Sequence, residues 1–326
     1  MAVYTPLSLE DASIWFDHSY QLGTLQTIKG INSGIENSNF FISASDEGQV
    51  TEFVLTIFER LSQQELLYYL ELMQYLANQG LQVPKPIQDR QGQLIQVLKG
   101  KPATVVTKLE GSPIAEPKTP HCQAVGQALA KMHLAGQNYQ NVQINLRGLH
   151  WWQQTVPEIL PFVQPEQAKL LLGELQAQEV FFASPEYSKL PQGPSHCDLF
   201  RDNVLFKQTS SVELSGFFDF YFAGVDTWLF DLAICLNDWC IDLDTGSLDA
   251  EKTTALLAAY QVVRPLIAAE RQLLNPMLRA GALRFWTSRL WDFHLPREAS
   301  MLTPHDPTHF ERVLRQRLAH PIGLST

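Results

Sequence analysis

The pattern of the sequence changes near residue 110, and this change limits the folds that the chain can adopt. The preceding part has short runs of β-branched and aromatic residues between turns rich in Gly and Asn, a pattern that predicts strands. One segment among them has the spacing of a helix: Ser62 and Glu65 can form a capping box, and Gly80 suits the position after the last turn. The expected strands span residues 22–29, 39–43, 52–58, 94–98 and 103–108.

The later part of the chain is mainly helical. A Pro-rich stretch at residues 110–120 separates it from the strand-rich part, so we place a boundary between two lobes after Lys108. Three strands, one helix and two strands predict a small antiparallel sheet with one helix packed on it. The sequence thus predicts an α+β protein with an N-lobe over residues 1–108 and a larger, mostly helical C-lobe over residues 109–326. The C-lobe helices are expected at residues 122–134, 165–178, 231–239, 249–263 and 270–293, with one hairpin at residues 203–206 and 212–218.

The composition restricts the partners and the compartment. A net charge of −10 and a pI near 5.4 argue against a nucleic-acid partner, because nothing offsets the charge of a phosphate backbone. The four cysteines show no C-x-x-C spacing, and free thiols are typical of a reducing compartment. No apolar run approaches the roughly 18 residues of a membrane span, and the first residues lack the apolar stretch of a signal peptide. We therefore expect a cytoplasmic protein that binds a small molecule, without nucleic acid or membrane; the oligomeric state stays open.

The sharpest motif is His196-x-Asp198, followed by Asn203 at the start of a predicted strand. A carboxylate at Asp198 on a rigid loop can accept the proton of an attacking hydroxyl, and the amide oxygen of Asn203 can ligate a metal. The returning strand brings Asp219 back to the same end of the hairpin. One base and two oxygen ligands suited to Mg²⁺ supply what phosphoryl transfer needs, which is positioning and neutralisation of charge. Alone, Asp198 could be a turn residue; the hairpin favours the catalytic interpretation, with His196 as a packed scaffold residue.

Residues 195–219 resemble the catalytic-loop and metal-loop pair of the protein-kinase-like superfamily, in the form found in aminoglycoside phosphotransferases and choline kinases. The resemblance implies a two-lobed fold that clamps ATP, with Asp198 as the catalytic base and Mg²⁺ on Asn203 and Asp219. Tyr221, two places after Asp219, departs from the Asp-Phe-Gly pattern in a way that this branch tolerates.

Four separated blocks narrow the resemblance to homoserine kinases of this fold. They lie at residues 34–41, 198–206, 231–240 and 285–290, and the similarity extends in matching order from about residue 4 to residue 307. The resemblance implies ATP-dependent phosphorylation of the hydroxyl group of L-homoserine to O-phospho-L-homoserine, on the way to threonine. The implied cofactors are ATP and Mg²⁺.

The resemblance also implies a nucleotide site in the N-lobe. The turn between residues 30 and 39 would cover the phosphates with its backbone amides, the strand end at residues 105–109 would meet adenine, and a helix glutamate would pair with a phosphate-binding lysine. As sequence alone, the commoner interpretations are a plain hairpin, an ordinary strand end and a solvated helix residue. Thr56 stands where the lysine is expected, and the candidates for the missing cation are Lys29, Lys85 and Arg60. The expected nucleotide-binding residues are Gly30, Ser33, Gly34, Asn37, Thr107, Leu109 and Glu71.

Homoserine is a zwitterion, so its pocket needs a carboxylate for the ammonium group and a cation for the carboxylate. Aspartates and arginines of the C-lobe can fill these roles, although Asp231 is equally suited to be a helix N-cap and the arginines to form salt bridges. The candidates are Asp202, Asp238 and Asp231 for the ammonium group, and Arg201, Arg284 and Arg289 for the carboxylate. Aromatic residues can line the pocket, but core packing is their commoner role. The expected substrate-binding residues are Asp202, Arg201, Tyr221, Asp238, Trp239 and Arg289.

Three other functions fit the same motif. A kinase of choline, ethanolamine, another amino alcohol or an aminoglycoside would share the catalytic loop and differ in the pocket; an aminoglycoside pocket should be strongly acidic, whereas this C-lobe mixes Asp with Arg. The missing strand lysine is compatible with an inactive nucleotide-binding scaffold, although Asp198, Asn203 and Asp219 are intact. An ATP-dependent regulator could bind a partner protein through the Trp-rich C-terminal helices.

Overall fold

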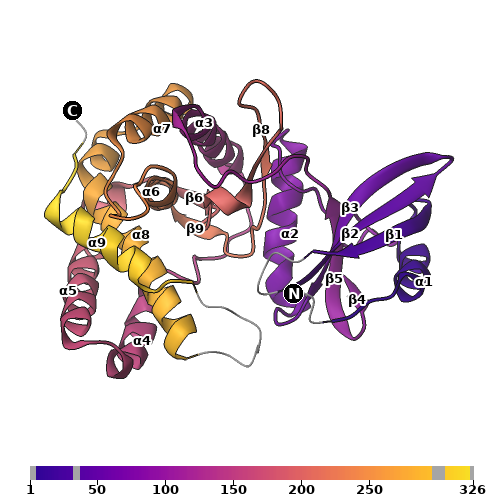
Figure 1. Ribbon diagram of the computed structural model, residues 1–326, viewed down its shortest axis with the longest axis horizontal. Helices are drawn as coiled ribbons and strands as arrows, with labels where there is room; N and C mark the ends of the chain where they lie inside the picture. The colour runs from indigo at the N-terminus through magenta and orange to yellow at the C-terminus, as the bar shows by residue number, and fades with distance from the viewer. Residues whose placement is uncertain (1–4, 32–36, 296–304, 324–326) are drawn as a thin grey trace. The chain divides into compact units, whose positions relative to one another are not determined.

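The structure is a computed structural model that describes residues 5–31, 37–295 and 305–323 of the chain (Figure 1). The chain divides into two compact units. The first unit comprises residues 1–110 and 216–221, and the second comprises residues 111–215 and 222–326. The division therefore falls after Glu110 instead of Lys108, and a short segment from the middle of the later part belongs to the first unit.

The first unit is built on a five-stranded antiparallel sheet with the strand order β1-β2-β3-β5-β4. Its longest ladder joins β2 to β3, which pair from Asn37 opposite Phe58 to Asp46 opposite Gln49. The five predicted strands and the helix predicted between the third and the fourth are confirmed. The elements are α1 (Leu9–Ser19), β1 (Thr24–Gly30), β2 (Asn37–Asp46), β3 (Gln49–Phe58), α2 (Gln63–Asn78), β4 (Gln96–Leu98) and β5 (Lys101–Thr107).

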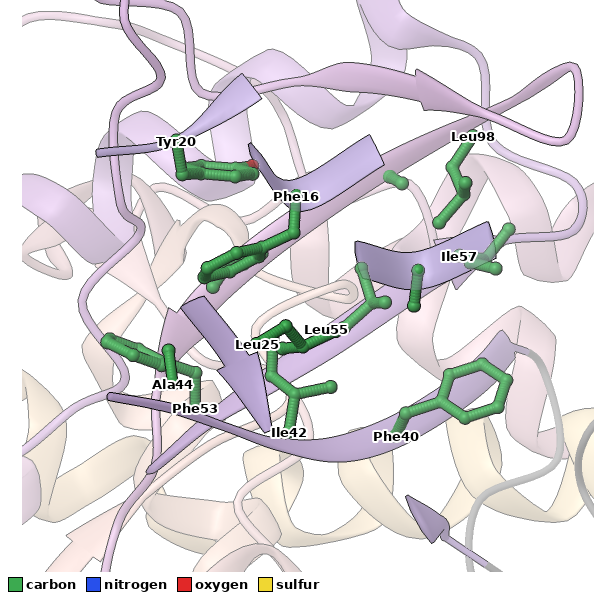
Figure 2. Packing of buried hydrophobic residues seen from close by; sticks show 13 residues of the cluster. Phe16, Tyr20, Leu25, Phe40, Ile42, Ala44, Phe53, Leu55, Ile57 and Leu98 are labelled. Atoms are coloured by element: carbon green, nitrogen blue, oxygen red, sulfur yellow. The ribbon is translucent and has the colours of Figure 1, made fainter. Parts of the chain in front are cut away.

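One face of this sheet carries the hydrophobic core of the first unit (Figure 2). Side chains at alternate positions of a strand point to the same face, and Phe53, Leu55 and Ile57 of β3 accordingly lie together in this core. Phe16 of α1 and Tyr20, which follows that helix, belong to the same cluster, so α1 covers this face. The core is completed by Ala12, Leu25, Phe40, Ile42, Ala44, Leu98, Ala103 and Val105.

Helix α1 is a correction to the expected fold. The sequence pattern predicts one helix in this part of the chain, whereas the described residues of the first unit contain two. An N-terminal signal is present, because the side chain of Ser8 accepts a hydrogen bond from the amide of Asp11, as an N-cap does. The apolar face of α1 is narrow, since its buried residues are Ala12, Phe16 and Ser19. Such a narrow face gives only a weak helical pattern in the sequence. The packing of α1 on the sheet stabilises the helix.

Helix α2 begins as predicted. The side chain of Ser62 accepts a hydrogen bond from the amide of Glu65 at 3.3 Å, and the Glu65 carboxylate accepts one from the amide of Ser62 at 2.8 Å. These two bonds form a capping box, which satisfies two amides that the first turn leaves without partners. After the helix, Gly80 has a φ of +85°, a left-handed conformation that glycine adopts without strain.

The second unit is mainly helical, and the five predicted helices and the predicted hairpin are confirmed. The structure adds α4 and α9. Every residue of α6 is buried, which agrees with its apolar sequence and makes it the central helix of this unit. No helix in the described ranges is long and apolar enough to cross a membrane. The elements are α3 (Thr119–Gly136), α4 (Leu149–Ile159), α5 (Pro165–Phe182), β6 (Gln192–Ser195), β7 (Val204–Phe206), β8 (Leu214–Phe217), β9 (Gly224–Thr227), α6 (Trp228–Trp239), α7 (Ala250–Val263), α8 (Ala268–His294) and α9 (Thr308–Ala319); β6 pairs with β9, and β7 with β8.

A buried arginine ties the C-terminal helix α9 to the centre of the second unit. Arg317 donates from Nε to Oδ1 of Asn237 in α6 at 2.9 Å and from Nη1 to the carbonyl oxygen of Gly246 at 3.1 Å. Asn237 in turn donates from Nδ2 to the carbonyl oxygen of Leu278 in α8 at 2.7 Å. Because buried polar groups are costly unless they are hydrogen-bonded, this network favours one arrangement of α6, α8 and α9.

Helices α3 and α7 approach closely at Gly126 of α3. A Cβ atom at this position would lie 2.3 Å from the carbonyl oxygen of Leu256 in α7, which is shorter than any normal contact. Gly173 in α5 is the contrasting case, because a Cβ atom there would meet nothing within 4 Å. Both glycines lie inside helices, so they differ in the space around them and not in backbone conformation.

We expect Gly126→Ala to lower the free energy of unfolding by about 1–3 kcal/mol, because the added methyl group forces α3 and α7 apart. Gly173→Ala should raise it by about 0.5–1 kcal/mol through the better helix propensity of alanine. Urea denaturation of both variants measures the two shifts. Equal shifts in the same direction would contradict the close packing of α3 on α7.

Candidate active site

The segment between β6 and β7, residues 196–203, is the candidate catalytic loop. Ser195, His196, Cys197 and Leu199 are each at most 1% exposed, whereas the intervening Asp198 is half-buried. A short 3-10 turn over Arg201–Asn203 then leads into β7. The loop therefore presents the Asp198 carboxylate from between two buried neighbours.

The backbone is strained at two positions in or beside the predicted catalytic residues. Cys197, immediately before Asp198, has a φ of +61°, and Asp219 has a φ of +66°. Residues other than glycine rarely adopt this left-handed conformation, which costs on the order of 1–3 kcal/mol. Such strain persists where the surrounding structure holds the backbone, and it is common at functional sites.

Asp231, in the first turn of α6, holds the strained part of the loop. The amide of His196 donates to Oδ2 of Asp231 at 2.7 Å, and the amide of Cys197 donates to Oδ1 at 2.9 Å. Asp231 is fully buried. Burial alone would raise its pKa, but the hydrogen bonds that it accepts from His133 and from the loop backbone hold the pKa below its usual value.

This role replaces both roles that the sequence suggests for Asp231. The N-cap of α6 is Thr227, whose hydroxyl oxygen accepts a hydrogen bond from the amide of Phe230 at 3.3 Å. A substrate ammonium group cannot reach a fully buried carboxylate whose two oxygens already accept hydrogen bonds from the loop. Asp231 is therefore a structural support of the catalytic loop.

The structure brings Asp198 and Asn203 together. Nδ2 of Asn203 donates to the backbone carbonyl oxygen of Asp198 at 2.8 Å and lies 3.3 Å from its Oδ2 atom. The nitrogen of the Asn203 amide is thus used within the loop, and its oxygen is the atom that suits a metal ion. The side-chain oxygen of Asn203 is a ligand of the kind that Mg²⁺ prefers, and the carboxylate of Asp219 in the first unit is of the same kind, so the chemistry of each residue fits the predicted metal.

Helix α6 also supports the middle of the loop. The carbonyl oxygen of Leu199 accepts a hydrogen bond from Nε1 of Trp239 at 3.0 Å, and the thiol of Cys235 lies 3.6 Å from the same oxygen. Trp239 has no exposed surface. Its ring is packed in the core beneath the loop, which does not favour the predicted contact of Trp239 with the substrate.

Two further residues that were expected to bind the substrate are paired with each other. Arg201 donates from its amide and its Nε atom to Oδ2 of Asp238, at 2.8 and 3.2 Å, and also donates from Nη2 to the Asp238 carbonyl oxygen. Burial raises the pKa of Asp238, and the positive charge of Arg201 opposes this rise. The pair joins the loop to the end of α6 and leaves neither residue as a simple partner for a zwitterion.

Arg289 in α8 has a different environment. Its guanidinium group lies 4.5 Å from the ring centre of Phe310 in α9 and donates from Nη1 to the carbonyl oxygen of Asp306 at 3.5 Å. Burial lowers its pKa, while nearby carboxylates, among them those of Asp202 and Asp198, favour its charged form. Arg289 therefore lies on the side of the second unit that faces the loop.

The three arginines that were candidates for a substrate carboxylate differ in what surrounds them. Arg201 is engaged by Asp238, and Arg284 is 3% exposed, with its guanidinium group 4.0 Å from the ring centre of Phe285. Arg289 is partly exposed. The helix α9, which supplies Phe310, has no expected counterpart in the sequence pattern, so this part of the site was missed.

The expected nucleotide-binding residues that the structure describes lie in the first unit. Gly30 ends β1 opposite Phe40, and Asn37 begins β2 opposite Phe58. Thr107 ends β5, where its hydroxyl oxygen accepts a hydrogen bond from the amide of Lys85 at 2.8 Å. Leu109 follows β5, and Glu71 lies half-buried in the middle of α2. Ser33 and Gly34 lie outside the described residues.

Thr56 occupies the strand position where a lysine was expected. Its hydroxyl group donates to Oδ1 of Asn39 at 2.8 Å. The ring of Tyr221 makes edge contacts with Phe58 and Tyr69, at centroid distances of 5.0 and 6.0 Å. Burial raises the pKa of Tyr221, so this residue is a neutral partner of β3 within the first unit.

Comparison with known proteins shows the family of this chain. The model of a phosphotransferase enzyme family matches residues 27–266. The chain is 58% identical to a homoserine kinase of Cupriavidus taiwanensis over 320 residues, which cover 98% of this chain and 96% of that protein.

Solved structures of kinases have the same fold. An amicoumacin kinase in complex with AMP-PNP, Ca²⁺ and Ami has a TM-score of 0.67 and 18% identity, over 95% of this chain and 91% of that chain. A spectinomycin phosphotransferase in complex with ADP and spectinomycin has a TM-score of 0.68 and 12% identity, over 97% and 99% of the two chains. These likenesses confirm the predicted protein-kinase-like α+β fold.

Proposed function

The chain belongs to the phosphotransferase enzyme family, and from this premise we propose that it transfers the γ-phosphoryl group of ATP to the hydroxyl group of L-homoserine. The product is O-phospho-L-homoserine, a precursor of threonine. The observation that carries the proposal is the strained catalytic loop, which presents Asp198 from buried surroundings in a chain similar over nearly its whole length to a homoserine kinase.

Asp198 acts as the base. Its half-buried carboxylate follows the strained Cys197, and its carbonyl and carboxylate oxygens both lie near Nδ2 of Asn203. A carboxylate held in one position can orient the substrate hydroxyl and accept its proton during attack on the γ-phosphate. His196 contributes to the scaffold, since it is fully buried and its amide is bound by Asp231.

Asn203 and Asp219 hold Mg²⁺, which when bound neutralises the negative charge of the ATP phosphates. The hairpin of β7 and β8 connects the two residues along the chain. Gly30, Asn37, Thr107, Leu109 and Glu71 of the first unit bind ATP, together with Ser33 and Gly34, which lie outside the described residues. The cation that replaces the strand lysine is one of Lys29, Lys85 and Arg60.

The substrate carboxylate binds Arg289, and the ammonium group binds Asp202. Asp202 is exposed in the 3-10 turn of the loop, whereas Asp231 is buried and Asp238 is paired with Arg201. Asp202 also contributes to the electrostatic environment of Arg289. Opposite charges at these two positions complement a zwitterion with a hydroxyl group, which is the chemistry of homoserine.

Release of ADP by the purified protein with Mg·ATP tests the reaction and the substrate together. We expect rapid turnover of L-homoserine and much slower turnover of choline, ethanolamine, L-serine, L-threonine and kanamycin. Preference for another alcohol would retain the phosphotransferase chemistry and overturn the substrate. If no alcohol causes ADP release while ATP still binds, the result would support an inactive nucleotide-binding scaffold instead.

We expect Arg289→Met to reduce kcat/KM for L-homoserine on the order of 10- to 100-fold, because a charge-assisted contact with the substrate carboxylate is lost. 3-Amino-1-propanol is homoserine without its carboxylate, so its slow phosphorylation should be nearly unchanged by the same substitution. Steady-state rates with both alcohols measure this difference.

Arg315→Met is the matched control, since Arg315 is a surface residue of α9 that pairs with Glu311. It should leave both rates unchanged. Equal losses with the two alcohols in Arg289→Met would show that this arginine does not recognise the carboxylate.

A further inference from the structure

A chain of buried polar side chains extends from Asp231 away from the catalytic loop. Nε2 of His133 lies 3.1 Å from Oδ2 of Asp231, and Nδ1 of His133 lies 2.7 Å from the hydroxyl oxygen of Tyr260. Nη1 of Arg264 donates to the same hydroxyl oxygen at 3.2 Å and to Oε1 of Glu270 at 2.9 Å. These side chains come from α6, α3, α7 and α8 and the connection between the last two, so distant parts of the second unit meet here.

The hydrogen bonds of this chain have one consistent direction. The Asp231 carboxylate can only accept, so Nε2 of His133 carries a hydrogen and donates it to Asp231. In a neutral imidazole Nδ1 then has no hydrogen and accepts from the Tyr260 hydroxyl group, whose oxygen accepts from Arg264. Burial lowers the pKa of His133, in opposition to the effect of Asp231, which agrees with a neutral ring.

The ring of His133 is also fixed by packing. The indole of Trp228, the first residue of α6, stacks on it with 5.5 Å between ring centres and 9° between planes. The guanidinium group of Arg264 lies 4.6 Å from the ring centre of Trp228. His133 has no exposed surface. Its ring therefore cannot turn without displacing the start of α6.

Asp231 accepts three hydrogen bonds in this arrangement. Its Oδ1 atom accepts from the amide of Cys197, and its Oδ2 atom accepts from both the amide of His196 and Nε2 of His133. The His133 bond is the one that does not come from the loop. Without this donor, only the two loop amides would orient the buried carboxylate. Those amides are the groups that the carboxylate has to hold in place, so the loop would lose an independent support.

We propose that His133 is a positioning residue for phosphoryl transfer, because its Nε2–H group orients the Asp231 carboxylate and thereby the strained backbone that presents Asp198. The consequence for turnover rests on the proposed role of Asp198, whereas the consequence for the loop does not. Tyr260 takes part by fixing the tautomer of His133. The side chains that face His133 are those of Asp231, Tyr260 and Trp228, with Arg264 and Glu270 behind them.

The test uses two substitutions with opposite expectations. His133→Leu removes the donor, whereas His133→Gln keeps an N–H group at a similar reach. In His133→Leu we expect amide exchange at His196 and Cys197 to accelerate about tenfold, with kcat reduced tenfold or more and KM for ATP nearly unchanged. His133→Gln should recover most of the exchange protection and most of kcat.

Gln178→Leu is the control for a general loss of stability. Gln178 is a buried residue of α5 that donates to Glu174 and to the carbonyl oxygen of Pro276. This variant should melt at a lower temperature, with exchange at His196 and Cys197 and kcat as in the unmodified protein. If His133→Leu does not fold, Tyr260→Phe replaces it and should give the same selective changes at two- to fivefold size, on the order expected for one weakened hydrogen bond.

The measurements test the positioning role of His133 separately from the proposed kinase function. Unchanged exchange at His196 and Cys197 in His133→Leu, or equal effects of leucine and glutamine, would overturn the positioning role. Accelerated exchange without any loss of kcat would also overturn it, because the loop would then not need the bond for transfer. If the protein phosphorylates none of the alcohols, the exchange data still decide whether His133 holds the loop, and a failure of the proposed function is recognised separately.

Discussion

The candidate site depends on the hydrogen bonds that the carboxylate of Asp231 accepts. A buried charge is costly unless it is compensated by hydrogen bonds, and Asp231 receives three, two of them from the amides that lead into Asp198. Those same bonds hold Cys197 in a left-handed conformation that an isolated chain would avoid. The loop that presents Asp198 is thus held by α6, a helix of the second unit in which every residue is buried.

Similar side chains have different roles because their surroundings differ. Asp231, Asp238 and Asp202 are all acidic residues close to the loop, but the first holds its backbone, the second pairs with Arg201, and the third is exposed. The arginines also differ, since Arg201 is paired with Asp238 and Arg284 is buried, whereas Arg289 is partly exposed and packs on Phe310. In the proposed function, the contacts with the zwitterion therefore fall on Asp202 and Arg289, which are less buried than Asp231 and Arg284.

Local patterns in the sequence were sufficient for much of the fold. Strand-forming runs, the capping box at Ser62 and the hairpin after Asn203 each depend on residues close together in the chain, and all are confirmed. Helices α1, α4 and α9 were missed; only three residues of α1 are buried, so its packing on the sheet decides its conformation. The motif His196-x-Asp198 marked the loop, but the partners of Asp231, Arg201 and Trp239 are set by long-range packing that spacing does not reveal.

The role of Asp198 is tested most directly by the single-turnover and steady-state rates of Asp198→Asn with Mg·ATP and L-homoserine, measured beside the affinity for ATP. Asparagine keeps the shape of the side chain and cannot accept the hydroxyl proton, so kcat should fall about 10²- to 10⁴-fold while ATP binds almost as before. Turnover close to that of the unmodified protein would contradict the assignment of Asp198 as the base and, with it, the function inferred from the loop.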